Sequence, residues 1–439
     1  MKTYLDKASE RRLVETPSPK EKSKVAIVKA ADYSQAEKAV REAVNLLGGV
    51  KAFVKPTDKV MIKPNMIAAT KPEEGEVTNP AMVEAVVKVF KESGAYVRVG
   101  EQTGWHGDPL TTFKVTGMYD AAMRGGADGV VNWDQDDYVD TPVPNGRCFA
   151  VVKLPRSLVE ADVIINVPKM KTNLVQVVTL GIKSWIGALH NSQRTFIHKN
   201  QLDNGFTTID VVKALGPRLK LNILDGIEGM EGSGPHAGLV TKPGIVLASS
   251  DVVAFSSVAC AIMGFHPMEV PAHQAGMKDG VGTADMREIE VLGRTIEEVK
   301  YPYLRPVPQV VNRYPNVMEF VGGACPGCQW TINSIPPYVD PDKKYAIVVG
   351  ARAMIGQDLA NFDEVWLSGI CGCAASHQLP GFDEKLARAK KVIRVNNCPG
   401  YNVMIHYHQD PASKGEVYSV PNLWLADMVA FWTVPDVTN

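Results

Sequence analysis

Five of the seven cysteines lie between residues 325 and 398, in three short groups that are each set among glycine or proline. Cys325 and Cys328 form a Cys-x-x-Cys, Cys371 and Cys373 form a Cys-x-Cys, and Cys398 is followed by proline and glycine. Thiolates bind soft and borderline metals, and small or kinked neighbours allow the chain to approach a cluster closely. The spacing predicts a thiolate-ligated centre, and an iron–sulfur cluster of the 4Fe-4S type fits it best.

Three other interpretations of these cysteines remain open. Zinc is the alternative metal, but its structural sites pair knuckles about 15 to 20 residues apart, whereas 42 residues separate Cys328 from Cys371. A redox-active dithiol would use one Cys-x-x-Cys and leave three thiols unexplained. Cysteine is also a small buried hydrophobe, which is what we expect of Cys148 and Cys260. Four thiolates suffice for a cluster, so the choice between Cys371 and Cys373 stays open.

Basic and amide side chains follow several apolar runs of strand type earlier in the chain. In sheets of parallel strands, ligands collect outside the carboxyl ends of the strands. Lysines at such positions favour an anion, so we expect a small anionic substrate there. The expected anion-binding residues are Lys63, Asn65, Lys169, Lys171 and Lys183.

Carboxylates follow other strand-type runs. They supply acid and base groups or hard ligands for a second metal, although capping and turn formation also use them. The candidates are Glu101, Asp225, Glu228 and Asp251. Gly226, Gly229, Gly232 and Gly234 predict a glycine-rich loop that matches neither the Walker nor the dinucleotide pattern.

The elements that must position these side chains alternate between strand and helix. Alternation of this kind predicts a parallel or mixed sheet with helices on both faces. Expected strands are residues 24–29, 59–63, 95–100, 129–133, 149–154, 162–167, 219–224 and 244–248, and expected helices are 35–47 and 80–93.

A second, smaller α/β pattern follows a proline-rich connector. Its expected strands are 345–350, 364–369 and 391–395, with a helix at 384–390. If these strands are parallel, the Cys371/Cys373 and Cys398 loops leave the same edge. We therefore expect a flexible leader at 1–23, a large α/β domain at 24–300, and a connector with a cysteine-rich α/β domain at 301–439.

Composition narrows the class of protein. The chain has 439 residues, 47 basic and 48 acidic side chains and a net charge of −1, which gives no global attraction for nucleic acid. The sequence has no apolar run long enough to suggest a membrane span, and it shows no pattern typical of a signal peptide. A cytoplasmic location is expected, with reduced cysteines.

A set of short motifs resembles a known family. The motifs are Lys63-Pro64-Asn65, Thr78-Asn79-Pro80, Val167 to Lys171, Thr179 to Lys183 and Asp225 to Gly232 followed by Gly234-Pro235. Together they resemble the domain of unknown function 362 family over about residues 24–265. The resemblance implies an association with iron–sulfur proteins. Members often carry a ferredoxin-like cysteine string, which this sequence lacks.

These observations lead to a hypothesis and two alternatives. The hypothesis is an iron–sulfur oxidoreductase of anaerobic-type metabolism that acts on a small anion and exchanges electrons with a redox partner protein. One alternative is a non-enzymatic electron-transfer or metallocentre-assembly protein. The other is a cluster-dependent lyase, in which iron acts as a Lewis acid.

Overall fold

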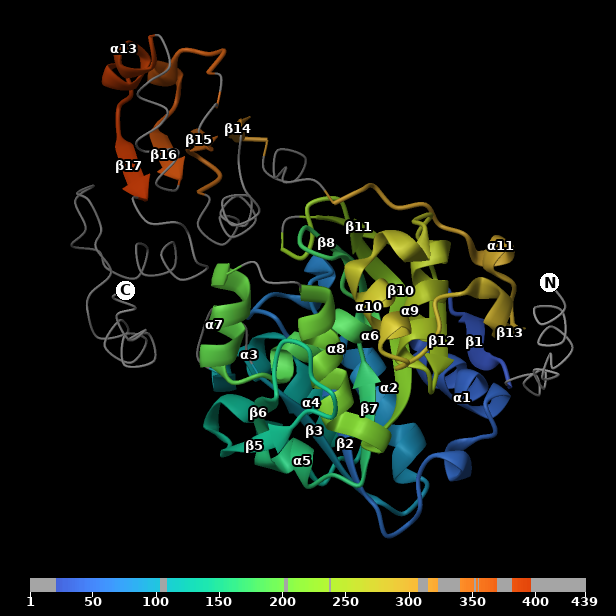
Figure 1. Cartoon of the computed structure of the whole chain (residues 1–439). Helices are drawn as coiled ribbons and strands as arrows, with labels where there is room; N and C mark the ends of the chain where they lie inside the picture. Colours follow the sequence, from blue (N-terminus) through green and yellow to red (C-terminus); the bar gives the residue numbers. More distant parts are fainter. Residues whose placement is uncertain are drawn as a thin grey trace, which may run out of the picture.

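The computed structural model describes residues 21–102, 109–200, 204–236, 238–306, 315–322, 340–350, 353, 355–368 and 381–395. These residues form a large sheet and a separate small sheet, both covered by helices (Figure 1). The mixed α/β class expected from the sequence is confirmed. The proposed domain limits at residues 23 and 300 stay predictions. Among the helices that the structure describes, none combines the length and the hydropathy that crossing a bilayer requires.

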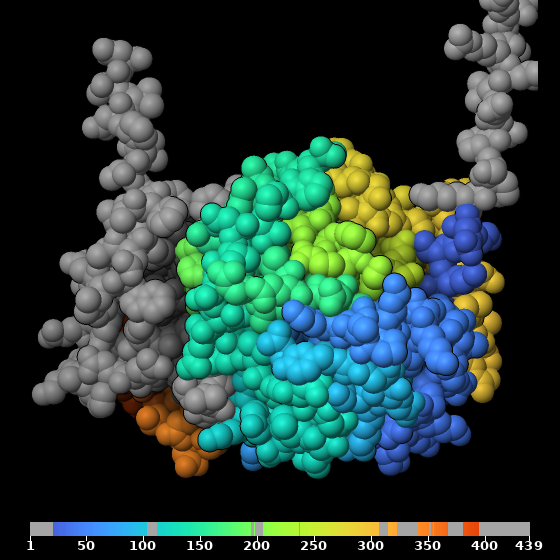
Figure 2. All heavy atoms as spheres, turned by 90° about the horizontal axis from the view of Figure 1, so that it is seen from below, coloured from blue at the N-terminus to red at the C-terminus, as the bar shows by residue number. Residues whose placement is uncertain are grey.

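The large sheet has eight strands along its main path, of which β12 alone runs antiparallel to its neighbours. The order is β13 (Ile289–Gly293), β1 (Ser23–Lys29), β12 (Ile245–Ser249), β10 (Leu219–Glu231), β7 (Val163–Val167), β2 (Lys59–Pro64), β3 (Tyr96–Glu101) and β4 (Gly129–Asn132). Because β1 pairs with β13, the first and last parts of this unit meet, and their blue and yellow surfaces adjoin in Figure 2.

Helices bury both faces of this sheet. Two apolar clusters lie on the two faces, and alternate residues of β1 point into them. Val25 and Ile27 belong to the first cluster, and Ala26 and Val28 belong to the second. The first cluster also takes residues from α8 (Asn204–Leu215), α9 (Val252–Ile262) and α10 (Pro271–Lys278). The second takes residues from α1 (Ala36–Leu46), α2 (Pro80–Lys91) and α4 (Met118–Arg124).

Shorter elements complete the large unit. They are α3 (Pro109–Val115), the hairpin of β5 (Tyr138–Pro142) and β6 (Val151–Pro155), α5 (Arg156–Val159), β8 (Lys169–Asn173), β9 (Val177–Val178), α6 (Leu180–Lys183), the 3-10 helix η5 (Ser184–Ala188), α7 (Asn191–Asn200), β11 (Leu239–Thr241) and α11 (Ile296–Val299).

Two predicted features of the large unit were wrong. The glycine-rich loop expected at Gly226, Gly229, Gly232 and Gly234 begins later than predicted, because β10 continues through the first two glycines to Glu231. Its glycines serve close packing, since a Cβ atom at Gly229 would lie 2.0 Å from the Tyr303 hydroxyl. Cys260 is buried as expected, but Cys148 is exposed.

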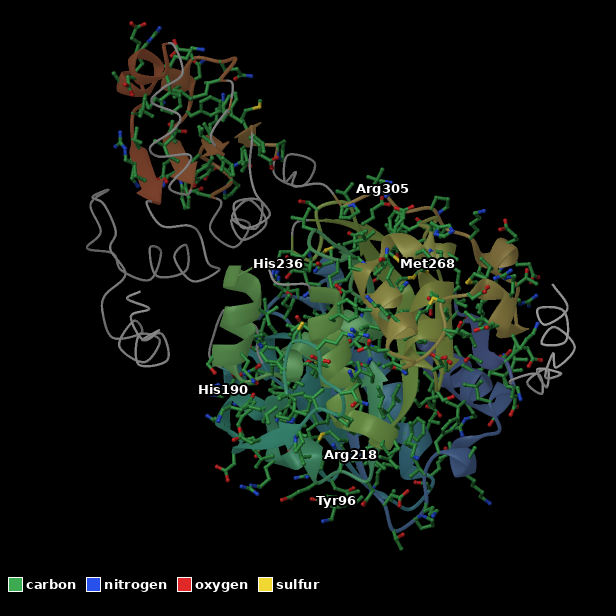
Figure 3. All side chains as sticks on the ribbon, viewed as in Figure 1. Tyr96, His190, Arg218, His236, Met268 and Arg305 are labelled. Carbon is green, nitrogen blue, oxygen red and sulfur yellow. The ribbon has the colours of Figure 1, made fainter. Side chains whose placement is uncertain are left out.

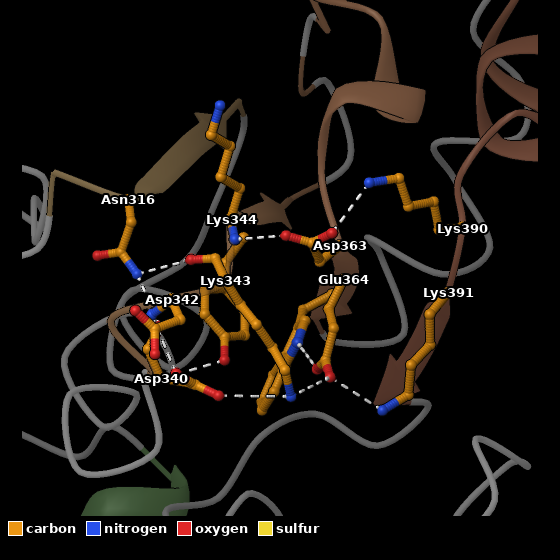
Figure 4. A network of polar contacts seen from close by, with 11 residues as sticks. Asn316, Asp340, Asp342, Lys343, Lys344, Asp363, Glu364, Lys390 and Lys391 are labelled. Atoms are coloured by element: carbon orange, nitrogen blue, oxygen red, sulfur yellow. Dashed lines mark hydrogen bonds and ion pairs between the residues drawn. The ribbon is translucent and has the colours of Figure 1, made fainter.

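The small sheet consists of four parallel strands. Their order is β14 (Val317–Val321), β15 (Tyr345–Val349), β16 (Glu364–Ser368) and β17 (Val392–Val395), with α13 (Phe382–Ala387) between the last two in sequence. At the amino ends of these strands a polar network surrounds Glu364 (Figure 4). Lys391 lies 3.0 Å and Lys343 3.9 Å from its Oε1.

Candidate functional site

The carboxyl ends of β2 and β3 bring together the first two predicted site residues. Lys63 and Glu101 occupy the end of adjacent parallel strands, and Lys63 Nζ lies 2.6 Å from Glu101 Oε2. Both side chains are fully buried or nearly so. Lys63 Nζ also donates to the main-chain oxygen of Pro64 at 3.0 Å, and Glu101 Oε1 accepts from the Gln102 amide at 2.9 Å. The pair is therefore an internal ion pair shielded from water.

Burial dominates the electrostatics of this pair. It raises the pKa of Glu101 to about 7, although the Lys63 ammonium opposes the shift. Burial also lowers the pKa of Lys63, and here Glu101 opposes. The two shifts bring the pKa values of the acid and the base towards each other, because burial disfavours the charged form of both groups. This arrangement is suited to general acid–base chemistry.

The short 3-10 helix η5 covers the pair. The ring of Trp185 has its centroid 5.6 Å from Lys63 Nζ. A Cβ atom at Gly187 would lie 3.2 Å from Glu101 Oε1 and 3.7 Å from Lys63 Nζ, so the backbone of η5 passes directly over the two charged groups. A residue with a side chain at position 187 would crowd them.

A second buried ion pair lies at the junction of β8 and β10. Asp225 N donates to Pro168 O at 2.9 Å, so β10 extends past the end of β7 and pairs with β8. Lys169 Nζ lies 3.0 Å from Asp225 Oδ2 and 2.9 Å from the hydroxyl of Tyr33. That hydroxyl donates to Asp225 Oδ1 at 3.0 Å. Burial, and then Asp225, raise the pKa of Tyr33, so the phenol keeps its proton.

Two further lysines lie in the same region. Lys171 is buried, and its Nζ donates to the main-chain oxygen of Glu76 at 2.5 Å. Burial lowers the pKa of Lys171 to about 7, against the influence of Glu76, and Lys183 adds to the effect. Lys183 is partly exposed, and desolvation, followed by repulsion from Arg194, lowers its pKa to about 8.

Two further polar contacts involve residues next to these lysines. Arg194 Nη1 donates to Gln102 Oε1 at 2.6 Å, which ties α7 to the end of β3. His236, labelled in Figure 3, has its Nδ1 3.0 Å from Glu76 Oε2.

The cations of the resulting cluster influence one another. Lys171 is influenced by Lys183, Lys169 and Lys63, and Lys63 in turn by Arg194, so these cations share one field. Among the described residues this group contains the cations Lys63, Lys169, Lys171, Lys183 and Arg194 and the carboxylates Glu76, Glu101 and Asp225. Lysines gathered at one edge of a sheet favour the binding of an anion there.

The remaining predicted residues are placed less uniformly. Asn65 lies beside the cluster, where its amide nitrogen donates to Thr78 Oγ1 at 2.7 Å and its side-chain Oδ1 is buried without a partner among the described residues. Glu228 is partly exposed and lies 3.3 Å from Lys242. Asp251 lies at the opposite edge of the sheet, because β12 is antiparallel, and it caps α9 through the amides of Val253 and Ala254.

Glu76, Tyr33 and Trp185 belong to the cluster but were not among the residues predicted from the sequence, and for Tyr33 a signal was present. Tyr33 comes shortly after β1, which is parallel to β2 and β10, so its position obeys the same rule as that of Lys63. Trp185 lies two residues beyond Lys183, in η5. Aromatic residues are seldom counted among candidate polar groups, and the contact that gives Tyr33 its role is with a residue far away in sequence.

The five predicted cysteine ligands lie outside the described residues. Among the residues that the structure does describe, no group of three or more His, Cys, Asp or Glu side chains could hold a metal ion.

Comparison with known proteins supports part of the expected resemblance. Residues 60–261 match the family model described as Domain of unknown function (DUF362). Thylakoid-associated protein sll1697 of Synechocystis sp. (strain ATCC 27184 / PCC 6803 / Kazusa) is 28% identical over 295 residues, which are 63% of this chain and 81% of that protein. The resemblance expected from the short motifs is thus confirmed for the family, while its association with iron–sulfur proteins remains a prediction.

Among solved structures, the lactate racemase apoprotein from Thermoanaerobacterium thermosaccharolyticum shows a weak likeness. Its TM-score is 0.36 at 13% identity, over 55% of this chain and 57% of that chain. The chain therefore spans less than two thirds of that structure, and a likeness of this strength does not indicate a shared activity.

Proposed function

We propose that this chain, whose residues 60–261 match the family of unknown function, is an iron–sulfur redox enzyme that binds a small anion at the carboxyl edge of its large sheet. The observation that carries the proposal is the buried ammonium group of Lys171, which lies among other lysines and whose acceptor within the described residues is a main-chain oxygen. Buried charges without counter-charges are costly, so a fold that retains them has a use for the field they create.

In this proposal each described residue has a defined task. Lys171 and Lys183 attract and orient the anion. Lys169 is held by Asp225 and Tyr33 and serves as a fixed part of the frame. Glu101 exchanges a proton with the substrate, and Lys63 stabilises the carboxylate that remains. A cluster bound to the cysteines would supply or accept the electrons.

The topology of the small sheet supports a common site for the three cysteine groups. β14 ends at Val321, four residues before Cys325; β16 ends at Ser368, three before Cys371; and β17 ends at Val395, three before Cys398. Because the strands are parallel, these ends share one edge.

The cofactor is tested by analysis of anaerobically purified full-length protein. We expect iron and sulfide in about equal amounts, broad absorption near ~400 nm and loss of iron on changing Cys325, Cys328 or Cys398 to Ala. Paired Cys371→Ala and Cys373→Ala variants identify the fourth ligand. Cys148→Ala is the matched control, since Cys148 is an exposed cysteine outside this region. Stoichiometric zinc without sulfide would overturn the iron–sulfur proposal.

A test of the lysine cluster separates the enzyme from an electron carrier. An electron-transfer or assembly protein needs the cluster but not the anion site, so Lys171→Met would leave its electron transfer unchanged. In the proposed enzyme, Lys171→Met abolishes the anion-induced change in the cluster spectrum while the iron content stays constant. A substrate-induced spectral change that survives this substitution would favour the lyase, in which the anion binds iron directly.

The proposal also concerns the location of the protein. Free thiolates and an iron–sulfur cluster are compatible with the reducing cytoplasm, which is where we place this chain. The name of the Synechocystis relative associates that protein with thylakoids, so fractionation of the native host is the direct check.

A further inference from the structure

Two ammonium groups in the cluster have no carboxylate partner. Lys63 is paired with Glu101 and Lys169 with Asp225. Lys171 has only a main-chain oxygen as acceptor within the described residues. For Lys183 Nζ, the same part of the chain offers no acceptor at all.

The backbone holds these two lysines close together. Thr179 N donates to Lys171 O at 2.9 Å, so the chain folds back from β9 onto β8 before α6 begins. The turn contains Val177 with φ of 65° and Leu180 with φ of 42°. A left-handed backbone is unfavourable at such residues and persists only where the surroundings enforce it.

Packing then fixes α6, which carries Lys183. A Cβ atom at Gly181 would lie 2.7 Å from Cδ1 of Phe255, so α6 lies directly against α9. Lys183 therefore extends from a helix whose position is set by the core.

Unused hydrogen-bond donors flank Lys183. The hydroxyl of Thr179 and Nε1 of Trp185 are both buried and have no partner among the described residues. Thr179 is 6% exposed and Trp185 is fully buried. Buried polar groups are nearly always satisfied in folded proteins, so two unsatisfied donors within four residues of Lys183 in sequence point to a ligand with several acceptor oxygens.

We propose that the anion bound at this edge is a small dianion, a phosphomonoester or a dicarboxylate, whose two negative charges are met by Lys171 and Lys183 and whose binding takes up a proton. This inference rests on the proposed function, since it names the class of anion that the same site accepts. Two fixed ammonium groups compensate two charges, and a monoanion would leave one of them without a counter-charge.

The proton uptake follows from the state of the lysines before binding. Burial brings the pKa of Lys171 to about 7, with Glu76 opposing and Lys183, Lys169 and Lys63 adding to the effect. Burial and Arg194 bring that of Lys183 to about 8. At pH 8 these amines are partly neutral. A bound dianion favours their charged forms, so binding draws protons from solution and weakens as pH rises.

Calorimetric titration of the full-length holoprotein with non-titrating anions tests this inference. Sulfate is the divalent probe and methanesulfonate its monovalent match, while succinate and butyrate form the dicarboxylate pair. We expect the favoured dianion to bind at least about tenfold more tightly than its monoanion. Titrations in buffers of different ionisation enthalpy should give uptake of between one and two protons at pH 8, with about a fiftyfold loss of affinity from pH 8 to 9.

The outcomes separate this inference from the function on which it rests. Equal affinity for sulfate and methanesulfonate and for succinate and butyrate, without proton uptake, would overturn the dianion inference and leave the anion site intact. Failure of all four anions to bind would overturn both. Preference for sulfate identifies the phosphomonoester class, and preference for succinate the dicarboxylate class.

A variant of Lys183 provides the second measurement. Lys183 is partly exposed, so Lys183→Met preserves the length of the side chain with little risk to folding. We expect it to abolish the preference for the dianion and to reduce proton uptake. Lys220→Met is the matched control, because Lys220 is an exposed lysine at the amino end of β10. An unchanged preference in Lys183→Met would overturn the assignment.

Discussion

The two buried lysine–carboxylate pairs at the edge of the large sheet are built from the same residue types but differ in how their carboxylates are held. Asp225 accepts hydrogen bonds from Lys169 at 3.0 Å, from the Tyr33 hydroxyl at 3.0 Å and from the amide of Asn79 at 2.8 Å. Three donors directed at one carboxylate fix its position. The pair and its partners connect the segment after β1, the strands β8 and β10 and the start of α2. It therefore has a structural role, and we call it the frame.

The pair of Lys63 and Glu101 is less completely satisfied. Glu101 accepts from Lys63 at 2.6 Å and from the amide of Gln102 at 2.9 Å. Burial outweighs these contacts and raises its pKa to about 7. The difference teaches that the number of donors decides whether a buried carboxylate is locked or able to exchange a proton. One pair supports the site, and the other is suited to act in it.

The largest expected effect is that of removing the charge of the frame. Asp225→Asn leaves Lys169 fully buried without a counter-charge and turns an acceptor into a donor facing other donors. We expect the free energy of unfolding to fall by about 3 to 5 kcal/mol, at pH 6 and pH 8 alike, measured by urea denaturation. Asp140→Asn is the control, since Asp140 pairs with Lys153 at the surface and should cost less than about 1 kcal/mol. A comparable small loss for Asp225→Asn would break the comparison.

The next effect is a change in pH dependence rather than a uniform loss. The pKa of Glu101 is raised from 4.5 to about 7, so the folded state holds a proton more strongly than the unfolded state does. Stability therefore falls as pH rises through this window. At about 1.4 kcal/mol for each pH unit of pKa difference, this carboxyl costs the wild-type protein about 3 kcal/mol between pH 4.5 and 7.

Glu101→Gln removes that dependence because glutamine does not titrate. Between pH 4.5 and 7, the free energy of unfolding of the variant should rise by about 3 kcal/mol relative to that of the wild type, as measured by denaturation curves. Glu73→Gln, at an exposed position, should run parallel to the wild type. A constant difference between Glu101→Gln and the wild type would mean that Glu101 is as firmly ionised as a surface carboxylate.

The sequence predicted most strands of both sheets, though not β13 or β14, because their apolar residues keep a clear period. The strand predicted at residues 59–63 is observed at Lys59–Pro64, and the helix predicted at residues 35–47 is observed at Ala36–Leu46. The prediction failed where tertiary contacts decide. β8, Lys169–Asn173, consists of lysines and polar residues, and the second half of β10 is rich in glycine and acid, so neither resembles a strand in isolation. Each becomes one by pairing with the other.

The candidate site was predicted in part for the same reason. Lysines after strands were found by position, but their ion-pair partners depend on which strands are neighbours. Glu101 and Asp225 were placed at the correct edge, whereas the position of Asp251 depends on the direction of β12, which no local pattern reveals. Tyr33 was missed because its role depends on a contact with Asp225, 192 residues away in sequence.

The smallest expected effect comes from the hydroxyl that joins the frame. Tyr33→Phe removes the hydrogen bond to Asp225 Oδ1 and the acceptor for Lys169 Nζ, but it leaves their ion pair at 3.0 Å intact. We expect a loss of about 1 kcal/mol in the free energy of unfolding, well below that of Asp225→Asn. Tyr96→Phe, at a half-exposed position, should change stability by less than about 0.5 kcal/mol. A loss in Tyr33→Phe as large as that in Asp225→Asn would show that the phenol, and not the ion pair, holds β1 to β10, because the lysine and the aspartate would then be unable to keep their contact alone.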